Sequence, residues 1–433
     1  MALLLQMVMP QVFLCMKKFV WIFCFFFLWM AISCSRQEVQ HTNVMPEEMR
    51  DSSFVTVPSP PISITVSSVG DVMMHRWQMN KAHRKETETF DFSKVFSFMQ
   101  DYFDQTDWLV GNLETTFAGK GKGRDTSILG YSCFPYFNAP DTFAYTIKSA
   151  GFDLMTLANN HTFDSGYEGL CSTINLLDSV GLSHVGAYRT KDERQRPFLV
   201  DVKGVKLGFC AYTSTTNGIH IPDSLKHVIS SIEGYRDDKM QMMKQNVEAL
   251  KKAGADAVIA LVHFGTEYQA LPNRYQCKVV DSLLTYGVDV VFGSHPHILQ
   301  KMEIKEVVRN GSKHKCVVFY SLGNFLSSQV RKDSLLKDVG LLATVQFTKW
   351  NGATRISEIT CVPTYTFWQP DYIGVLPVLE TKKSLEKFSK LRVKDWLNLD
   401  LTSFLVENIL FSKSVEYKKN ESGYRIKLPK CED

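Results

Sequence analysis

Histidine side chains in this chain follow short apolar runs at close spacing. The stretch "VFGSHPHILQ" places His295 and His297 on either side of Pro296, directly after such a run. The stretch "ANNHTFD" brings Asn160, His161 and Asp164 together in the same way. Imidazole, carboxamide and carboxylate groups can bind a divalent ion, and an imidazole can also transfer a proton. A tight turn stiffened by Pro296 is the alternative explanation of the histidine pair.

Other side chains of the same kinds follow other apolar runs. Gly70 and Asp71 end the first run, "GNLE" follows the second, and His263 closes "AVIALVHF". Each of them alone has an ordinary explanation, as a turn, an Asx cap or a partly buried histidine. Their recurrence at five strand ends predicts one shared polar site. The candidates are Asp71, Asn112, Glu114, Asn159, Asn160, His161, Asp164, His263, His295 and His297.

The chemistry of these donors indicates a transition-type metal ion. Carboxylates together with neutral imidazoles suit zinc, manganese or iron, whereas calcium and magnesium favour oxygen ligands alone. Two divalent ions side by side would activate water and hold a phosphoryl or similar group. The site is therefore expected to take one or two divalent ions.

The elements that must position these residues alternate between apolar runs and helical patterns, which predicts an α/β fold. In open α/β sheets, ligands bind at the carboxyl ends of the strands, where the candidate residues stand. The predicted strands are residues 62–69, 108–110, 154–157, 205–212, 258–262, 288–292 and 317–321. The predicted helices are residues 141–150, 170–180, 237–253 and 274–286.

Three helix-to-strand connections share one plan. In "KSAGFDL", "KKAGADA" and "LTYGVDV" a glycine ends the helix and an aspartate follows two residues later. Gly151, Gly254 and Gly287 are expected to take the left-handed conformation that stops a helix. The aspartates are expected to open the strands.

The N-terminus resembles a secretory signal. Two lysines precede fourteen apolar residues, 19–32, and then Ser33 and Cys34. This apolar run is shorter than the roughly 20 residues of a membrane-spanning helix. The ending Ala-Ile-Ser-Cys is similar to a bacterial lipobox, which implies cleavage before Cys34 and its lipidation. An uncleaved signal anchor is the alternative, and Met16 is a candidate for the true start.

The remaining chain divides into three parts. Residues 35–61 are polar and end in "VPSPP", which predicts a flexible tether. Residues 62–375 form the main domain, whose residues 339–363 alternate like antiparallel strands, and residues 376–433 form a C-terminal extension with a covering helix. The net charge of +4 on 433 residues gives no reason to expect nucleic acid as a partner.

Six motifs resemble, in order, those of the CapA/PgsA family of bacterial capsule and poly-γ-glutamate biosynthesis proteins, which are related to calcineurin-like metallophosphoesterases. They are "SSVGDVMMHR", "GNLETTF", "NAPDTFAYTIKSAGFDLMTLANNHTFDSG", "LVHFGTEY", "VFGSHPHILQ" and "FYSLGNFL", which span about residues 62–330. The resemblance implies a metallophosphatase-like sandwich of two mixed β-sheets flanked by helices, with a small helical extension at the C-terminus.

The resemblance also implies roles for individual residues. The metal ligands are expected to be Asp71, Glu114, Asn160, His263, His295 and His297. His161 is expected to act as the catalytic acid or base, oriented by Asp164. Arg76, Asn112, Asn159, Glu267 and Asn324 are expected to contact substrate, and Arg76 suits an anionic one. Met73 departs from the family pattern, because related phosphoesterases carry a histidine ligand at this position.

Two functions follow from this resemblance. The first is a metal-dependent hydrolase or transferase that uses activated water on an anionic polymer of the bacterial cell envelope. The second is a non-catalytic accessory protein that binds the polymer or its membrane synthase. In both, lipidated Cys34 holds the protein at a membrane, in the periplasm or at the cell surface.

Overall fold

The computed structural model describes residues 60–329, 337–384, 386, 388, 391–411 and 415–428. The predicted signal segment lies outside the described residues, as does nearly all of the predicted tether. Within the part of the chain that is described, no helix has both the length and the hydropathy needed to span a bilayer.

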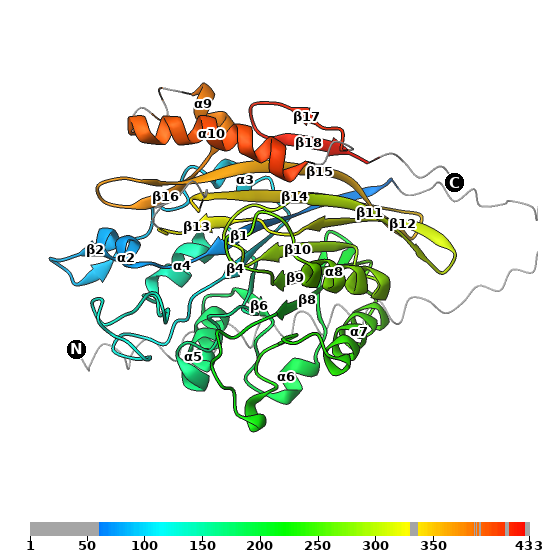
Figure 1. Ribbon diagram of the computed structural model, residues 1–433, viewed down its shortest axis with the longest axis horizontal. Helices are drawn as coiled ribbons and strands as arrows, with labels where there is room; N and C mark the ends of the chain where they lie inside the picture. Colours follow the sequence, from blue (N-terminus) through cyan, green and yellow to red (C-terminus); the bar gives the residue numbers. More distant parts are fainter. Residues whose placement is uncertain are drawn as a thin grey trace, which may run out of the picture. The chain divides into compact units, whose positions relative to one another are not determined.

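Two mixed β-sheets form the framework (Figure 1). In the first sheet the order is β17-β18-β15-β14-β1-β4-β5-β6, with β13 beside β1 and β16 beside β15. Its strands are β1 (Ile62–Val72), β4 (Trp108–Leu113), β5 (Leu154–Thr156), β6 (Ser183–Val185), β13 (Asn324–Leu326), β14 (Val339–Trp350), β15 (Ala353–Trp368), β16 (Ile373–Pro377), β17 (Lys418–Lys419) and β18 (Tyr424–Lys427). The strands β1, β4, β5, β6 and β13 run parallel, and β14 is antiparallel to β1.

The second sheet has the order β11-β12-β10-β9-β8-β7. Its four central strands are parallel, and each edge strand is antiparallel to its neighbour. The strands are β7 (Phe198–Val202), β8 (Val205–Thr213), β9 (Ala257–His263), β10 (Val290–Ser294), β11 (Met302–Arg309) and β12 (Ser312–Phe319). A separate two-stranded ribbon joins β2 (His83–Arg84) and β3 (Thr89–Phe90).

Helices cover both outer faces of the pair of sheets (Figure 1). Those near the outer face of the first sheet are α2 (Arg76–Ala82), α3 (Gln100–Phe103), α4 (Thr142–Ser149) and α5 (Gly166–Ser179). In contrast, α9 (Val378–Lys383) and α10 (Val393–Leu410) pack against β15 and contribute side chains to the core that the two sheets share. Those of the second sheet are α7 (Asp237–Lys252) and α8 (Arg274–Tyr286), and the short α6 (Lys191–Gln195) precedes β7. This arrangement confirms the expected sandwich of two mixed sheets flanked by helices.

Alternation of side chains explains why the central strands are buried on both faces. Along β1, Ile64 and Val66 pack into the core between the sheets, where Leu207 of β8 also lies. Val69 and Val72 belong instead to the core that Phe143 and its neighbours form under the helices of the first sheet. The second sheet has a corresponding outer core against α7 and α8.

The three glycine–aspartate connections set the starts of parallel strands. Gly151, Gly254 and Gly287 all have positive φ, as predicted. The carboxylate of Asp153 accepts a hydrogen bond from the backbone N–H of Leu109 at the start of β4, at 2.8 Å. The carboxylate of Asp256 accepts a hydrogen bond from the backbone N–H of Lys206 in β8, at 2.7 Å. The carboxylate of Asp289 accepts one from the backbone N–H of Val258 in β9, at 2.9 Å. Each aspartate therefore satisfies the backbone N–H of the second residue of a strand and helps to fix the register of the adjacent pair.

The C-terminal residues form the expected helices and also two short strands. Residues 358–361 of β15 pair with residues 424–427 of β18, so the end of the chain extends the first sheet. Tyr424 is fully buried in the core between strands and helices. The alternation in "YRIK" is too short to predict such a strand from the sequence.

Candidate metal centre

The carboxyl ends of parallel strands from both sheets meet at one edge of the sandwich. Asp71 of β1 stands opposite Asn112 of β4 on one side and Asn324 of β13 on the other. In the second sheet, His263 of β9 stands opposite Ser294 of β10. The amide Nδ2 of Asn112 lies 3.2 Å from Nδ1 of His263, so the two sheet edges are in direct contact. The predicted convergence of strand ends is therefore what the fold produces.

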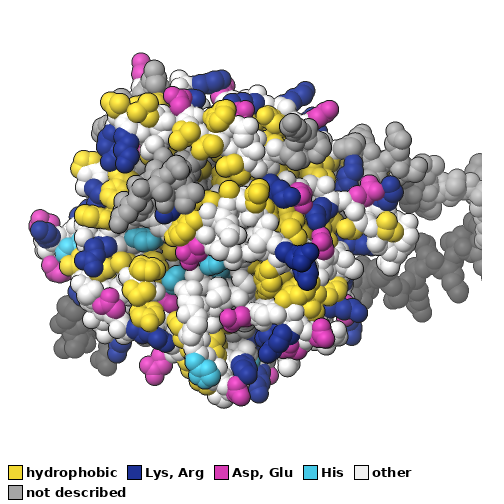
Figure 2. Space-filling model, in the orientation of Figure 1, with side chains coloured by type: hydrophobic (Ala, Val, Ile, Leu, Met, Phe, Trp, Pro, Cys, Tyr) yellow, Lys and Arg dark blue, Asp and Glu magenta, His cyan; other side chains and the backbone are white. Residues whose placement is uncertain are grey.

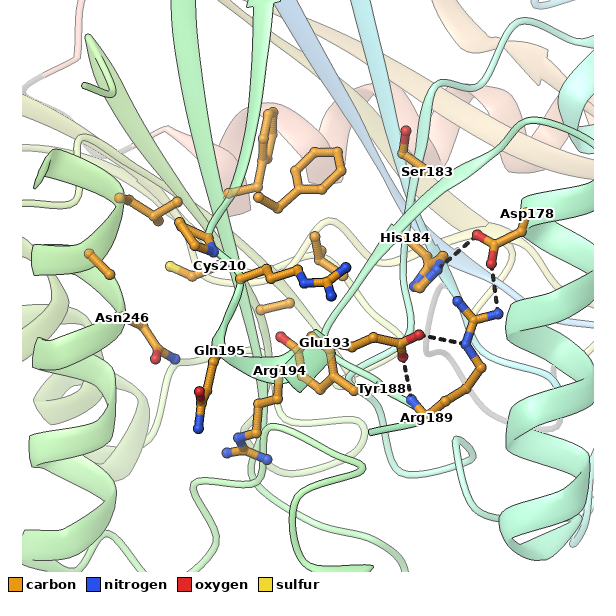
Figure 3. Close-up of a pocket in the computed structure, with 18 of the residues that line it drawn as sticks. Asp178, Ser183, His184, Tyr188, Arg189, Glu193, Arg194, Gln195, Cys210 and Asn246 are labelled. Carbon is orange, nitrogen blue, oxygen red and sulfur yellow. Dashed lines mark hydrogen bonds and ion pairs between the residues drawn. The ribbon is translucent and has the colours of Figure 1, made fainter. Parts of the chain in front are cut away.

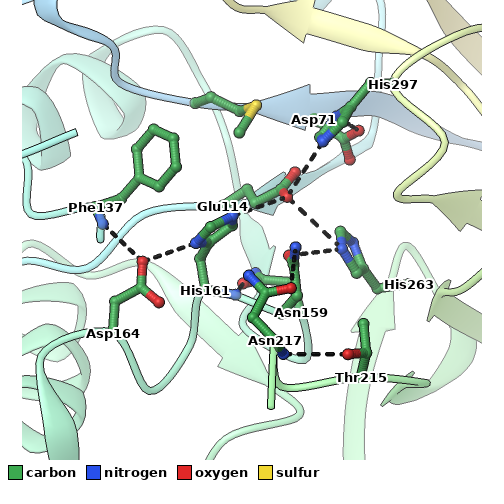
Figure 4. Close-up of polar contacts among 12 residues, drawn as sticks. Asp71, Glu114, Phe137, Asn159, His161, Asp164, Thr215, Asn217, His263 and His297 are labelled. Carbon is green, nitrogen blue, oxygen red and sulfur yellow. Dashed lines mark hydrogen bonds and ion pairs between the residues drawn. The ribbon is translucent and has the colours of Figure 1, made fainter. Parts of the chain in front are cut away.

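Glu114 lies at the centre of this group (Figure 4). Its side chain is fully buried, and neither carboxylate oxygen has a hydrogen-bond partner. Its Oε1 is 3.7 Å from Nε2 of His263, 3.8 Å from Nε2 of His297 and 3.9 Å from Nε2 of His161. Burial, followed by the nearby Asp71, raises the pKa of Glu114 well above its usual range. Ionising a carboxylate that is buried in this way costs free energy unless a cation compensates the charge.

The donor atoms fall into two groups that share Glu114. One group is Asp71, Glu114 and His297, and the other is Glu114, His263 and His295. Within each group the ligand atoms lie within 4.8 Å of one another, and every member is buried. Oδ1 of Asn160 is 2.9 Å from Nε2 of His263, so it adds a fourth donor to the second group. The residues present therefore fit two adjacent divalent ions, of the kinds that carboxylates and imidazoles favour.

Contacts behind Asp71 and His297 fix the orientation of the first group. Asp71 Oδ1 accepts a hydrogen bond from Asn112 Nδ2 at 2.8 Å. Nδ1 of His297 lies 3.0 Å from Oδ2 of Asp71 and 3.1 Å from Oδ1 of Asn324. Because both neighbours are acceptors, the proton is on Nδ1, and the lone pair of Nε2 faces Glu114. Burial alone would lower the pKa of His297, but the hydrogen bond and charge of Asp71, together with Glu267 and Asn324, raise it above its usual value.

The histidines of the second group are held as neutral imidazoles. Burial, followed by His295, lowers the pKa of His263 well below its usual value. Burial likewise lowers the pKa of His295 to about 4, and its Nδ1 is buried with no hydrogen-bond partner. A neutral imidazole is the form that binds a metal ion.

The turn that carries the two histidines is strained. His295 has φ +97° and His297 has φ +58°, both in the left-handed region that residues other than glycine rarely adopt. Conformations of this kind cost about 1–3 kcal/mol each and collect at functional sites. The carbonyl oxygen of Pro296, between them, accepts a hydrogen bond from the backbone N–H of Tyr268 at 2.8 Å. The turn thus serves to aim two imidazoles at Glu114.

A close approach of the backbone makes Gly70 necessary beside Asp71. A Cβ atom at position 70 would lie 2.0 Å from the carbonyl oxygen of Gly323, so any other residue would push the strand carrying Asn324 away from β1.

His161 and Asp164 form a hydrogen-bonded pair next to the two groups (Figure 4). Nδ1 of His161 donates to Oδ2 of Asp164 at 2.7 Å, and the backbone N–H of Phe137 donates to the same oxygen at 2.6 Å. The second nitrogen of His161, Nε2, therefore faces Glu114. The predicted orienting contact between Asp164 and His161 is present in the structure.

A pocket of about 780 Å³ opens onto this centre. Arg76, His161, Glu267 and His297 are among the residues that line it, together with aromatic residues such as Tyr268. Figure 2 shows histidine and acidic side chains gathered in a hollow on this face. Arg76 and Glu267 thus stand where a substrate would enter, and their roles stay predictions.

Asn112, Asn159 and Asn324 lie behind the pocket wall. Their side chains contact the ligand-type residues: Asn112 bonds to Asp71, and Asn324 to His297. Nδ2 of Asn159 donates to the carbonyl oxygen of Leu113 at 2.7 Å and to Oδ1 of Asn112 at 3.2 Å. None of the three is among the described residues that line the pocket. Their geometry fits orienting the metal ligands better than the expected contact with substrate.

The structure adds two residues that sequence reasoning missed. Oγ of Ser294 is 3.1 Å from Nδ1 of His263, and Oδ1 of Asn217 accepts a hydrogen bond from Nδ2 of Asn160 at 3.2 Å. Asn217 follows β8, the strand whose carboxyl end carried no predicted site residue. The Asn-Gly pair at 217–218, a turn signal just beyond that strand end, is the sequence feature that could have indicated it.

A second cavity, of about 530 Å³, lies between β6, α6, β8 and α7 (Figure 3). Among its charged side chains, Arg189 pairs with Asp178 and with Glu193, each at 2.8 Å, and His184 lies 3.2 Å from Asp178. Arg194 instead donates to the backbone carbonyl oxygen of Ile229 at 2.8 Å. None of the groups of metal-ligand type among the described residues lies there. The chemistry of the protein is therefore centred on Glu114.

Glu114→Gln tests the shared carboxylate. Glutamine has the same shape as glutamate but no charge. We therefore expect the metal affinity of both donor groups to fall by more than about 100-fold, which exceeds the loss caused by changing a residue that only orients a ligand. We expect the metal-free variant to be about as stable as the metal-free parent, because the raised pKa keeps Glu114 protonated there and the glutamine side chain likewise carries no charge. Metal content by mass spectrometry and thermal unfolding measure the two effects. Glu267→Gln is the matched control and should keep its metal; loss of metal in the control alone would contradict this assignment.

The raised pKa values of Glu114 and His297 predict that metal binding releases protons. Glu114 and His297 have raised pKa values and hold protons to higher pH in the metal-free protein, whereas His263 and His295 are already neutral. Metal affinity should therefore rise with pH until Glu114 and His297 have both lost their protons, which happens at higher pH than for an ordinary glutamate and histidine. Calorimetry in two buffers of different ionisation enthalpy measures the release, and an enthalpy independent of the buffer would refute this prediction.

Comparison with known proteins identifies the family of this chain. The sequence model of the family described as "Bacterial capsule synthesis protein PGA_cap" matches residues 65–329. The capsule biosynthesis protein CapA of Bacillus anthracis is 28% identical over 270 residues, covering 61% of this chain and 60% of that relative. The PGA biosynthesis protein CapA of Bacillus subtilis (strain 168) is also 28% identical over 270 residues, covering 61% of this chain and 64% of the relative. A 5'-nucleotidase of Diplobatis ommata is 33% identical over 172 residues, 37% of this chain and 26% of that protein.

The chain thus matches about three fifths of the length of the two CapA relatives. The matched residues 65–329 contain every member of both donor groups as well as His161 and Asp164. The family match covers more than half of the chain, and the chain belongs to the bacterial capsule synthesis protein family PGA_cap.

Proposed function

We propose that the protein is a metal-dependent hydrolase or transferase that acts on an anionic polymer during capsule synthesis at the bacterial envelope. The observation that carries this proposal is Glu114, whose two oxygens are buried without a hydrogen-bond partner and whose Oε1 lies close to three histidines, of which His161 and His297 line the open pocket. The family and the names of the two CapA relatives support the capsule role.

The two donor groups would hold two divalent ions, manganese, zinc or iron, on either side of Glu114. Asp71, Glu114 and His297 would hold one, and Glu114, Asn160, His263 and His295 the other. When bound, such ions polarise substrate oxygens and lower the pKa of water. The first position has one donor fewer, because Met73 stands where related phosphoesterases carry a histidine.

His161 is positioned to transfer a proton. Its Nδ1–H is held by Asp164, so its orientation is fixed and the proton exchanged with substrate would be on Nε2. That nitrogen is near Glu114, yet His161 belongs to neither donor group. We assign it the role of acid or base for the leaving group, with Asp164 as its positioning residue.

The pocket suits an anionic substrate. Arg76 is exposed at the pocket wall, and no carboxylate of the described residues forms an ion pair with it. Arg124 lies over the ring of Tyr136, which also lines the pocket, at 5.1 Å. Cationic side chains at the mouth of a site favour phosphate or carboxylate groups.

A non-catalytic accessory role is the second candidate. Met73 favours it, because the first donor group keeps only three ligands among the described residues. In this case the same pocket would bind the polymer or a membrane synthase without turning it over.

His161→Asn tests which function is correct. With the metal-loaded protein and phosphodiester or γ-glutamyl substrates, we expect the variant to lose about 10²–10⁴-fold in kcat, the usual contribution of a general acid or base. Its metal content should be unchanged. Asp164→Asn should lose less, because it orients His161 without touching the substrate. A fully metallated parent protein that hydrolyses neither substrate class would favour the accessory role instead.

We also propose that the protein is anchored at a membrane by a lipid on Cys34. The support is the lysine-led apolar run and the Ala-Ile-Ser-Cys ending. Cys34→Ser should move the protein from the membrane fraction to the soluble fraction or leave the signal uncleaved. A variant that fractionates and migrates like the parent would contradict lipidation.

A further inference from the structure

His75 is a third histidine near the first donor group, and no role has been assigned to it. It follows β1 at the start of α2, two residues after Met73. Its ring lines the pocket together with His161 and His297. His75 belongs to neither donor group, so neither of its nitrogens lies within 4.8 Å of every ligand atom of either group.

The hydrogen bonding of His75 determines which nitrogen faces the pocket. The backbone N–H of Ser328 donates to Nδ1 of His75 at 3.4 Å. Because a backbone N–H can only donate, Nδ1 is an acceptor here, and the single proton of a neutral imidazole must be on Nε2. Burial, followed by the nearby His297, lowers the pKa of His75 to about 3, so the ring is neutral at ordinary pH. Nε2 is then the ring nitrogen that can donate to a ligand in the pocket that His75 lines.

Phe137 holds His75 and His161 on the same wall. Its ring meets the ring of His75 edge to face, with centroids 5.2 Å apart, and that of His161 with centroids 4.6 Å apart. Its backbone N–H also holds Asp164. One residue thus orients the proton-transfer pair and presents a second imidazole beside it.

Arg76 adds charge next to this donor. It follows His75 directly and lies exposed on the pocket wall. A neutral N–H donor beside a guanidinium favours an oxygen that carries negative charge. A metal ion would instead need a lone pair, which Nδ1 has already used.

We propose that His75 is a positioning residue that donates its Nε2–H to an anionic oxygen of the substrate, with Arg76 neutralising the charge. This inference rests on the proposed function and adds that the charged group of the substrate lies next to Met73, on the side of the first donor group. A phosphodiester oxygen and a carboxylate oxygen have the chemistry that this pair recognises.

The test measures binding, so it does not depend on turnover. Titration of the full-length, metal-loaded protein with inorganic phosphate, and separately with γ-glutamylglutamate, gives a Kd for each kind of anion. His75→Phe keeps the packing against Phe137 and removes the donor. We expect it to weaken binding of the preferred anion by about tenfold, the loss of one good hydrogen bond. His75→Gln keeps an N–H donor and should lose less.

Two further readouts separate this role from others. Metal content and thermal stability of His75→Phe should equal those of the parent, and nitrogen NMR should show the His75 proton on Nε2, shifting when the anion is added. Loss of one metal equivalent in His75→Phe would make His75 a ligand and overturn the proposal. It is overturned as well if the Kd values are unchanged, or if the parent binds neither anion. If the protein binds an anion through His75 but hydrolyses no substrate, the role of His75 stands and only the proposed enzymatic activity is contradicted.

Discussion

A buried carboxylate with no partner is the constraint on which this protein depends. Glu114 has both oxygens removed from water and from every donor, in a fold that satisfies nearly all its other polar groups. The cost of such a group is several kcal/mol when nothing compensates it. Burial, followed by the charges of Asp71, Glu267 and Asp164, raises its pKa. Three imidazole nitrogens stand just beyond hydrogen-bonding distance around it. This arrangement is explained if Glu114 is shared between two cations.

The rest of the fold can be understood as the support of that carboxylate. Two sheets bring parallel strand ends to one edge, and a side-chain contact between Asn112 and His263 joins them. Aspartates at the strand starts fix the register, and the left-handed conformations of His295 and His297 cost stability to aim the imidazoles. The side-chain amides of Asn112 and Asn324 contact Asp71 and His297, so these two ligand side chains are held in place. The unfavourable backbone conformations therefore occur at residues whose side chains must be held in a fixed orientation.

Much of this could be predicted from the sequence. Short apolar runs followed by Asp71, Glu114, His263 or His297 locate the strand ends, and parallel strands bring such ends together. The helix-ending glycines were predictable because few other residues adopt positive φ. The fold class followed from the same alternation and from the motif series.

Other features depend on tertiary geometry that the sequence does not encode locally. Asn112 lies at the end of β4, two positions before Glu114, yet its amide is used by Asp71 and does not reach the pocket. The partner of Asn160 proved to be Asn217, 57 residues away, after a strand with no motif. The proton position on His75 follows from the backbone of Ser328, which is 253 residues distant. The two C-terminal strands form because β15 offers an edge, not because their own residues favour a strand.

The central claim is that Glu114 is shared between two divalent ions, and anomalous diffraction from crystals of the manganese-loaded protein tests it most directly. The account predicts two anomalous peaks on either side of Glu114, one beside Asp71 and His297, the other beside His263 and His295. The second peak should have the higher occupancy at limiting metal, because Asn160 gives that position a fourth donor. Manganese peaks elsewhere with none beside Glu114, in crystals grown at saturating metal, would contradict the account.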